Sequence, residues 1–393
     1  MSRDPTSLGL RLSLLHAASF VGVGIYLSFF PVWLASRGLD ATTIGFVLAI
    51  PMVVRIVVTA PLLGLADRSV GPRRLLIACH AAQILGYVAL ALIANNLAIA
   101  VLIALLAVVH APVIPGNDLV TTNAIRDGAP LNYGRVRVWG SVSFLVSSIL
   151  MGYLVDGIGP QVVVWGMALT PLLGIAATRL ALPRQGGEGR PTGGQPMTRV
   201  PLPRVLWIVM AAASFTQASH AAVYAFGSIH WRGIGFSDSV IGYLWAIGVL
   251  AEIGVLFGLG RGVGQGTAAL KLIVIGSVAA IIRFVLMTTD PGITATFALQ
   301  ALHGLSFGAT HLGAIAALTA LAPDQARGRA QGAYVATAAL TMAVMTIASG
   351  PLYRAFGSLA FATMAPLGAI GLVLTLVALR MIASRRREQV QDA

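Results

Sequence analysis

Residues 38–55 read GLDATTIGFVLAIPMVVR, and residues 235–252 read GFSDSVIGYLWAIGVLAE. Ile44-Gly45 aligns with Ile241-Gly242 at an offset of 197 residues, nearly half of the 393-residue chain. The Ala-Ile pair that follows each of them aligns at the same offset. Similarity of a chain to itself at a fixed offset indicates an internal repeat. The sequence therefore predicts two related halves that run parallel to each other.

The composition indicates a membrane protein. Hydrophobic residues make up 57% of the chain and charged residues only 10%, whereas soluble domains have about 25% charged residues. The mean hydropathy is +0.86. Apolar runs of about 20 residues recur along the chain, each long enough to cross a bilayer as a helix. We therefore expect an all-α polytopic membrane protein.

The apolar runs predict twelve transmembrane helices in two sets of six. The expected spans are residues 10–35, 42–66, 74–94, 97–124, 138–155, 161–182, 204–230, 239–260, 269–288, 293–321, 330–353 and 358–380. Residues 183–203, rich in Gly and Pro, predict a flexible cytoplasmic linker. The predicted domains are thus an N-terminal half over 1–182 and a C-terminal half over 204–393.

The positive charges predict the orientation of the chain. With the N-terminus inside, 21 Lys and Arg residues lie on the cytoplasmic side, and only Arg37, Arg232 and Arg354 lie outside. This bias indicates two cytoplasmic termini in a cell membrane, the inner membrane in a Gram-negative bacterium. The net charge of +13 follows this alternation, so we expect no nucleic-acid partner. Because no metal-ligand spacing, phosphate-binding loop or nucleophile elbow occurs, we expect no metal, no cofactor and no enzymatic activity.

A second, weaker alignment concerns the fourth and tenth spans. At an offset of 193 residues, His110 pairs with His303 and Asp118 with His311. Eight residues is a little over two helical turns, so each pair is expected near one helix face. Asp118 in lipid costs roughly 2.5–3.5 kcal/mol on insertion scales, and such residues mark transport pathways.

The two predicted halves and their linker resemble the major facilitator superfamily of secondary transporters. That family typically has Gly-x-Leu-Ala-Asp-Arg-x-Gly-Arg-Arg after its second helix, and this chain has Leu65-Ala66-Asp67-Arg68, then Gly71 and Arg73-Arg74. Leu63 replaces the first glycine, and one extra residue precedes Gly71. The resemblance implies that Asp67 and Arg68 form a gating contact at the cytoplasmic face. The alternative is a solvated turn with orientation charges.

Three further segments are similar to the phenylpropionic acid permease branch of that superfamily. They are NYGRVRVWGS at 132–141, SHAAVY at 219–224, and GYLW at 242–245 followed by Ala251-Glu252. This branch is usually described as proton symporters for aromatic acids and is similar in outline to oligosaccharide:proton symporters. The resemblance implies alternating access, with binding near the midplane and no covalent chemistry.

Four charged residues lie well inside predicted spans: Arg55, Asp118, Glu252 and Arg283. Their charges balance, which favours mutual pairing. Arg283 is a candidate partner for Glu252, and Arg55 and Arg137 are both candidate partners for Asp118. A buried ion pair that only locks two helices together is the alternative for the arginines.

From depth, repeat position and resemblance we assign roles to these residues. Proton coupling is assigned to Asp118, Glu252 and His311. Substrate binding is assigned to Arg55, Arg137, His220, Tyr224, Trp245, Arg283 and Tyr26. For the histidines the alternative is a hydrogen-bonded packing role, and for the aromatic residues it is anchoring at the lipid interface.

The sequence thus predicts a secondary active transporter that takes up a small organic, aromatic acid with protons. Within transport, a proton-coupled sugar or nucleoside symporter and a drug or metabolite exporter are the alternatives. A non-transporting membrane sensor or scaffold is the alternative of another class. The expected partners are a small-molecule substrate, protons and the lipid bilayer, and the protein is expected to be a monomer.

Overall fold

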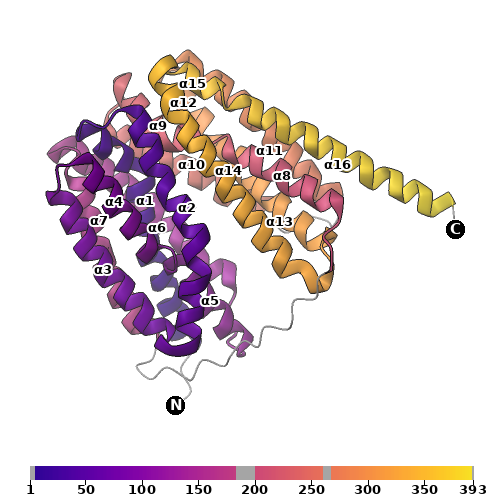
Figure 1. Ribbon diagram of the computed structural model, residues 1–393, viewed down its shortest axis with the longest axis horizontal. Helices are drawn as coiled ribbons and strands as arrows, with labels where there is room; N and C mark the ends of the chain where they lie inside the picture. The colour runs from indigo at the N-terminus through magenta and orange to yellow at the C-terminus, as the bar shows by residue number, and fades with distance from the viewer. Residues whose placement is uncertain (1–4, 183–199, 260–266, 392–393) are drawn as a thin grey trace. The chain divides into compact units, whose positions relative to one another are not determined.

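The chain folds entirely into helices wherever the structure describes it. The computed structural model (Figure 1) describes residues 5–182, 200–259 and 267–391, and all regular structure in these ranges is helical. The described residues contain twelve helices long and apolar enough to cross a membrane, from Ser7–Ser36 to Leu359–Ser384. This confirms the predicted all-α membrane fold, and the span boundaries differ from the predicted ones by a few residues.

The first six spans contain seven α-helices, and one π-helical segment lies between the second and third spans. They are α1 (Pro5–Ser36), α2 (Ala41–Leu65), η1 (Ala66–Val70), α3 (Pro72–Leu92), α4 (Asn96–His110), α5 (Val113–Arg126), α6 (Tyr133–Ile158) and α7 (Val162–Ala181). The fourth span is the one that is divided, into α4 and α5.

The last six spans are more interrupted. They comprise α8 (Arg204–Ala218), α9 (Ala221–Gly233), α10 (Asp238–Leu259), α11 (Thr267–Leu286), η2 (Met287–Thr289), α12 (Ile293–Ala301), η3 (Gly304–Ala309), α13 (Thr310–Leu321), η4 (Asp324–Ala326), α14 (Arg327–Phe356), α15 (Leu359–Ala362) and α16 (Ala365–Gln391). The seventh span is α8 with α9, and the tenth is α12, η3 and α13.

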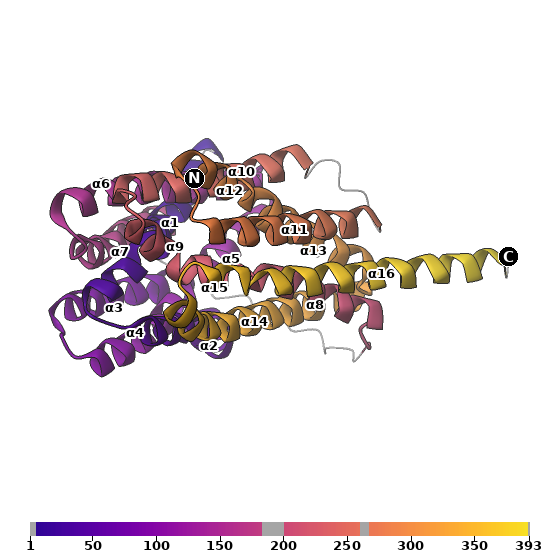
Figure 2. The ribbon, with the colours of Figure 1, turned by 90° about the horizontal axis from the view of Figure 1, so that it is seen from above.

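The chain divides into two compact units, and the same helix pairs pack in each. The first unit comprises Met1–Asp40, Ile50–Gly194 and Trp231–Ala246, and the second comprises Ala41–Ala49, Gln195–His230 and Ile247–Ala393. In the first unit α1 packs on α6 and α7, and α3 packs on α7. In the second unit α8 packs on α14 and α16, and α11 packs on α16, as Figure 2 shows for α16. These pairs are first with fifth, first with sixth and third with sixth in both halves, which confirms the repeat.

Apolar side chains fill the interior of each unit. In the first unit Leu12 and Leu15 of α1 meet Val136 of α6 and Ala177 of α7. In the second unit a larger cluster joins α8, α11, α13, α14 and α16. Burying a Leu or Val side chain of these clusters contributes about 1.5–3 kcal/mol relative to exposing it to water.

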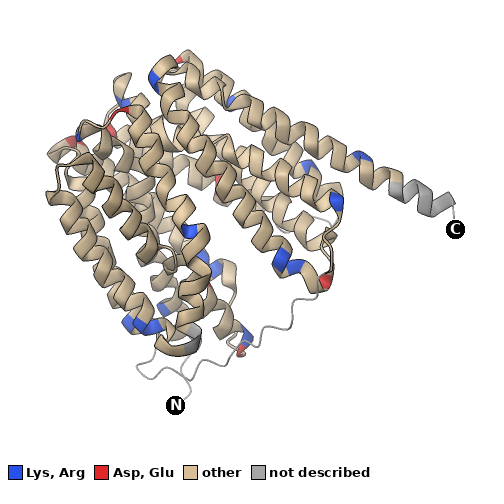
Figure 3. Cartoon of the chain, in the orientation of Figure 1, with Lys and Arg blue, Asp and Glu red and all other residues tan. Residues whose placement is uncertain are grey.

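The outer surface of the helices is also apolar. Leu85 is 73% exposed, Val57 68% and Leu169 63%, all in the middle of transmembrane helices. In Figure 3 Lys, Arg, Asp and Glu colour only short pieces of the helical ribbon, most of which is tan. Large exposed apolar side chains on a helix are typical of a surface that faces lipid.

Two predicted features fall on residues for which little is described. Of the predicted linker 183–203, residues 183–199 lie outside the described part, and α8 begins at Arg204. Asp67 and Arg68 belong to the π-helical segment η1 (Ala66–Val70), but their side chains lie outside the described part. The linker and the gating contact therefore stay predictions.

Candidate functional site

Three histidines lie at interruptions of transmembrane helices. His110 is the last residue of α4, and Pro112, which has no N–H to donate, occupies the N-cap of α5. His220 lies in the two-residue break between α8 and α9. His303 is the N-cap of the π-helical segment η3. Interrupted helices and π-helical turns are frequent at the binding sites of transporters, so these breaks locate the candidate sites.

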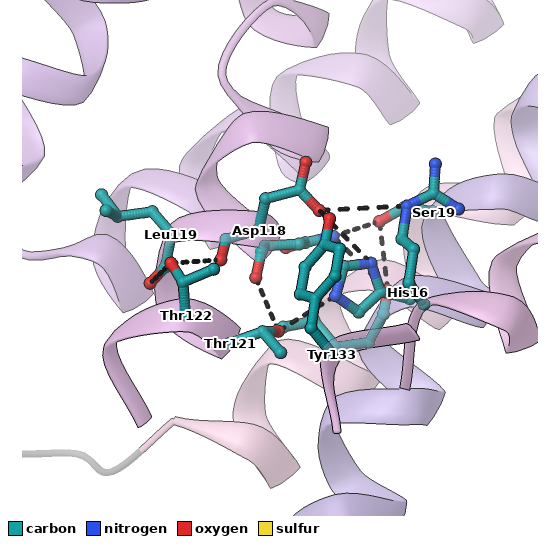
Figure 4. Close-up of polar contacts among 10 residues, drawn as sticks. His16, Ser19, Asp118, Leu119, Thr121, Thr122 and Tyr133 are labelled. Atoms are coloured by element: carbon teal, nitrogen blue, oxygen red, sulfur yellow. Dashed lines mark hydrogen bonds and ion pairs between the residues drawn. The ribbon is translucent and has the colours of Figure 1, made fainter. Parts of the chain in front are cut away.

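The first site surrounds Asp118 on α5 (Figure 4). The hydroxyl of Tyr133 donates a hydrogen bond to Asp118 Oδ1 at 2.8 Å. Arg137 Nε and His16 Nδ1 each lie 3.9 Å from the same oxygen. The Asp118 side chain is 35% exposed, so the carboxylate is reachable and still surrounded by donors.

Polar contacts behind Asp118 fix the helices that carry this site. His16 Nε2 lies 3.0 Å from Thr121 Oγ1, which joins α1 to α5. Asn117 Nδ2 donates to Ser19 Oγ at 2.8 Å between the same two helices. The Arg137 guanidinium lies over the Phe20 ring at 3.9 Å. Of the two partners left open for Asp118, the structure thus brings Arg137 to it.

A cavity of about 240 Å³ lies in the first unit, among α1, α2, α3, α4, α5 and α7. Tyr26 and Arg55, two of the predicted substrate-binding residues, line it. Tyr87 and His110 also line it, and the Tyr87 hydroxyl lies 2.5 Å from His110 Nε2. The Tyr26 ring stacks on Phe30 with centroids 4.8 Å apart. This cavity is mainly apolar and aromatic, with one cation in its lining.

A second polar cluster lies in the second unit and centres on His303. His303 Nδ1 lies 3.3 Å from Arg283 Nη1, and His303 Nε2 lies 4.0 Å from Glu252 Oε2. Arg283 is only 1% exposed and also donates to Gln300 Oε1. A buried arginine must be paired or hydrogen-bonded. The imidazole thus connects the carboxylate of α10 to the guanidinium of α11.

His220 and Tyr224 form the aromatic side of this cluster. His220 Nδ1 lies 3.0 Å from the Gln217 carbonyl oxygen and Nε2 lies 2.9 Å from Ser306 Oγ. A carbonyl only accepts, so Nδ1–H donates and Nε2 accepts from the serine. His220 is fully buried with both nitrogens paired, and its ring packs against His303 and Tyr224 at 5.3 and 5.7 Å.

The remaining predicted residues take other positions. The His311 ring stacks on Phe307 at 6.1 Å, and His303 stacks on the same ring at 5.1 Å. This agrees with the expected placement of both histidines near one helix face. Trp245 is buried and packs on Trp231 at 6.0 Å. All the assigned substrate and proton roles stay predictions.

Sequence reasoning gave little weight to three residues that the structure brings into these clusters. The sequence assigned no role to His16 or His303, and Tyr133 is part of the segment NYGRVRVWGS at 132–141. The alignment of His303 with His110 was the available signal for His303. Among the described residues, no group of three or more His, Cys, Asp or Glu side chains is placed to hold a metal ion.

Twelve apolar helices in two repeats, interrupted at buried polar clusters, define a secondary transporter of the major facilitator type. The chain belongs to the MFS_1 like family, whose model matches residues 10–363. It is 30% identical over 369 residues to a protein of Escherichia coli (strain K12) named "Probable 3-phenylpropionic acid transporter". That match covers 90% of this chain and 93% of the relative, and it supports the predicted phenylpropionate permease-like branch. These relatives are transporters and not enzymes.

A second relative and two solved structures extend the comparison. The maltose permease of Geobacillus stearothermophilus is 24% identical over 300 residues, covering 76% of this chain and 75% of the permease. The crystal structure of the nucleoside transporter NupG has a TM-score of 0.77 at 16% identity, covering 95% of this chain and 99% of that one. A bacterial homolog of the lysosomal transporter Spinster has a TM-score of 0.71 at 15% identity, covering 98% of both chains. At such identities the two structures support the fold alone.

Proposed function

We propose that this transporter takes up a small aromatic acid together with protons. The observation that carries the proposal is the position of His303, in contact with Glu252 at 4.0 Å and with Arg283 at 3.3 Å. We propose further that it works as a monomer by alternating access, with both termini in the cytoplasm of an inner or plasma membrane. The relative named as a probable 3-phenylpropionic acid transporter supports the substrate class.

The contacts of His303 support coupling to protons. A carboxylate, an imidazole and a guanidinium in a chain respond to one another, because each charge changes the energy of its neighbour. The Glu252 side chain is 23% exposed, so protons can reach it. Adding a proton to Glu252 removes a negative charge near the buried Arg283, and the cluster must then rearrange or bind an anion.

Asp118 supplies a second exchangeable carboxylate, in the first unit. Its partners are a phenol, an arginine and a histidine. A bound substrate that approaches Arg137 competes with Asp118 for that charge. Uptake of a proton by Asp118 would free Arg137 for the substrate, which is a direct physical link between proton and anion.

A sugar is the second candidate substrate. The maltose permease relative favours it, and so does the Asp118 site, because carboxylates and arginines both hydrogen-bond hydroxyl groups. The two candidate substrates differ in charge. A binding site for an acid must contain a cation that no protein carboxylate already neutralises. A binding site for a neutral sugar must contain hydrogen-bond donors and acceptors for its hydroxyl groups.

Uptake by the purified full-length protein in proteoliposomes tests the proposal. The expected result is accumulation of labelled 3-phenylpropionate under an inward proton gradient, abolished by a protonophore. Glu252→Gln and Asp118→Asn should each lose accumulation, while Arg380→Gln, an exposed site on α16, should behave as wild type. Full accumulation by both variants would contradict the coupling assignment. If the proteoliposomes accumulated maltose under the gradient and did not accumulate 3-phenylpropionate, the proposed substrate would be a sugar and not an acid.

A further inference from the structure

We propose that the cavity of the first unit is a binding site for a small aromatic carboxylate. Arg55 holds the carboxylate there, and the aromatic and aliphatic lining holds the ring. The inference rests on the proposed function, because it names where the proposed substrate class binds. Ser19, which accepts a hydrogen bond from Asn117 next to Asp118, also lines this cavity.

The size and lining of the cavity fit a ring with a short acid chain. Its volume is about 240 Å³, and a cavity of about 150 Å³ is enough to admit benzene. Phe30, Ile103 and Leu106 are buried residues that line it. Small-molecule sites are typically apolar and aromatic cavities with a few polar groups that fix the orientation of the ligand.

Arg55 gives this cavity its charge. Among the described residues the Arg55 guanidinium has no hydrogen bond and no ion pair, and none of the residues that line the cavity is acidic. Arg55 lies in the span Ala41–Leu65, where an unpaired cation is costly and marks a functional site. A guanidinium binds a carboxylate through two parallel hydrogen bonds. An anionic ligand is therefore the partner that the site lacks.

Three other polar side chains in the lining have partners, whereas the buried His80 Nε2 has none among the described residues. Tyr87 and His110 are hydrogen-bonded to each other at 2.5 Å. Gln83 lies 3.1 Å from His80 Nδ1 and also donates to the Val109 carbonyl. Because these three side chains have partners, none of them competes with a ligand for Arg55.

The internal repeat shows that the two halves differ at the position of Arg55. The residue aligned with Arg55 in the second half is Glu252, and Glu252 has His303 nearby. The tyrosines Tyr26 and Tyr224 lie in the first spans of the two halves, and Tyr224 packs against His303. The second half thus contains its own counter-charges around the corresponding position, whereas the first half presents a cation alone.

Equilibrium binding to the purified full-length protein in detergent tests this site. The probe is radiolabelled 3-phenylpropionate, with the neutral 3-phenylpropanamide as competitor. We expect Arg55→Gln to weaken binding of the acid about 10- to 100-fold, as loss of a hydrogen bond to a charged group does. The wild type should prefer the acid over the amide at least tenfold, and Arg55→Gln should lose that preference. Arg380→Gln is the matched control and should bind as wild type.

A cavity-filling variant tests the ring site independently of Arg55. Ala107 lines the cavity, so Ala107→Phe should abolish binding, while Leu105→Phe, on a side chain 59% exposed on the same helix, should not. If Arg55→Gln fails to fold, Arg55→Lys, which should lose the two-pronged contact, is measured in its place. Wild-type affinity in the Arg55 and Ala107 variants would overturn the inference while leaving transport intact. If the wild type neither binds nor transports any aromatic acid, the proposed function fails as well.

Discussion

Asp118 Oδ1 and Arg137 Nε lie 3.9 Å apart, one on α5 and the other on α6. Tyr133, four residues before Arg137 and so on the same face of α6, donates its hydroxyl to the same carboxylate oxygen at 2.8 Å. The carboxylate is therefore shared between a charged and a neutral donor from one helix. A change in its protonation alters both contacts at once.

We expect Asp118→Asn and Arg137→Gln each to reduce gradient-driven accumulation at least tenfold. The two side chains are 35% and 29% exposed, so their ion pair contributes only about 1 kcal/mol to stability. The loss of uptake should therefore far exceed the loss of thermal stability. Both quantities are measured on the same preparations, by proteoliposome uptake and by the melting temperature in detergent.

The double variant and a charge-conserving variant are the controls for this pair. Because the residues are in contact, the effects of Asp118→Asn and Arg137→Gln should not add. Asp118→Glu, which keeps the charge, should retain more uptake than Asp118→Asn. Additive effects in the double variant would mean that the two residues act independently.

His303 and His220 should respond differently to substitution. His303→Gln removes a group that can bind a proton and that contacts both Glu252 and Arg283, so accumulation should fall at least tenfold. His220→Gln should lower the melting temperature instead, because His220 is fully buried with both nitrogens hydrogen-bonded. The measurements are uptake with and without a proton gradient, and thermal unfolding.

Exchange transport separates coupling from binding in the His303 variant. A residue needed only for coupling leaves substrate exchange across the membrane near its wild-type rate when no gradient is present. Equal loss of exchange and accumulation in His303→Gln would assign the residue to substrate binding or packing. Wild-type accumulation would remove it from the mechanism.

The sequence could predict the spans because hydropathy and helix length alone determine them. The sequence could also identify Arg55, Asp118, Glu252 and Arg283. A charged residue inside an apolar run is visible in the sequence even when its ion-pair partner is unknown. The structure adds a break between α4 and α5 at Ala111-Pro112, where proline cannot continue the hydrogen-bonding ladder of the helix.

The contact partners of these charged side chains were harder to predict, because they depend on how each helix is rotated about its axis. Asp118 had two possible arginines, and only packing of α5 against α6 selects Arg137. The π-helical segment at Gly304–Ala309 contains no proline, so the sequence has no signal that predicts this interruption of the helix. It follows His303 directly, so the contact of His303 with Arg283 could not be derived from residue spacing.

Two glycines of α6 should respond in opposite ways to alanine. A Cβ at Gly152 would lie 2.4 Å from the Asp238 carbonyl oxygen, a backbone atom that cannot move aside easily. A Cβ at Gly157 would meet nothing within 4 Å. We expect Gly152→Ala to destabilise the protein by about 1–3 kcal/mol, and Gly157→Ala to stabilise it by about 0.5–1 kcal/mol. Thermal unfolding of both variants checks this, and a shift of the same sign in both would contradict it.

Asp290 combines a left-handed backbone with a hydrogen bond, and its variants should separate the two. Its φ is +48°, among the described residues the only positive value outside glycine, and its Oδ1 lies 2.8 Å from His230 Nε2. Asparagine tolerates this backbone conformation and keeps an acceptor oxygen, whereas alanine loses the hydrogen bond and is strained by about 1–2 kcal/mol. Glycine removes the strain but also the acceptor. The melting temperature should therefore fall in the order wild type, Asp290→Asn, Asp290→Gly, Asp290→Ala. Suppose that Asp290→Gly melted at the wild-type temperature and that His230→Gln did not change the melting temperature. The hydrogen bond would then contribute nothing to stability, and the left-handed backbone alone would determine which residues are tolerated at position 290.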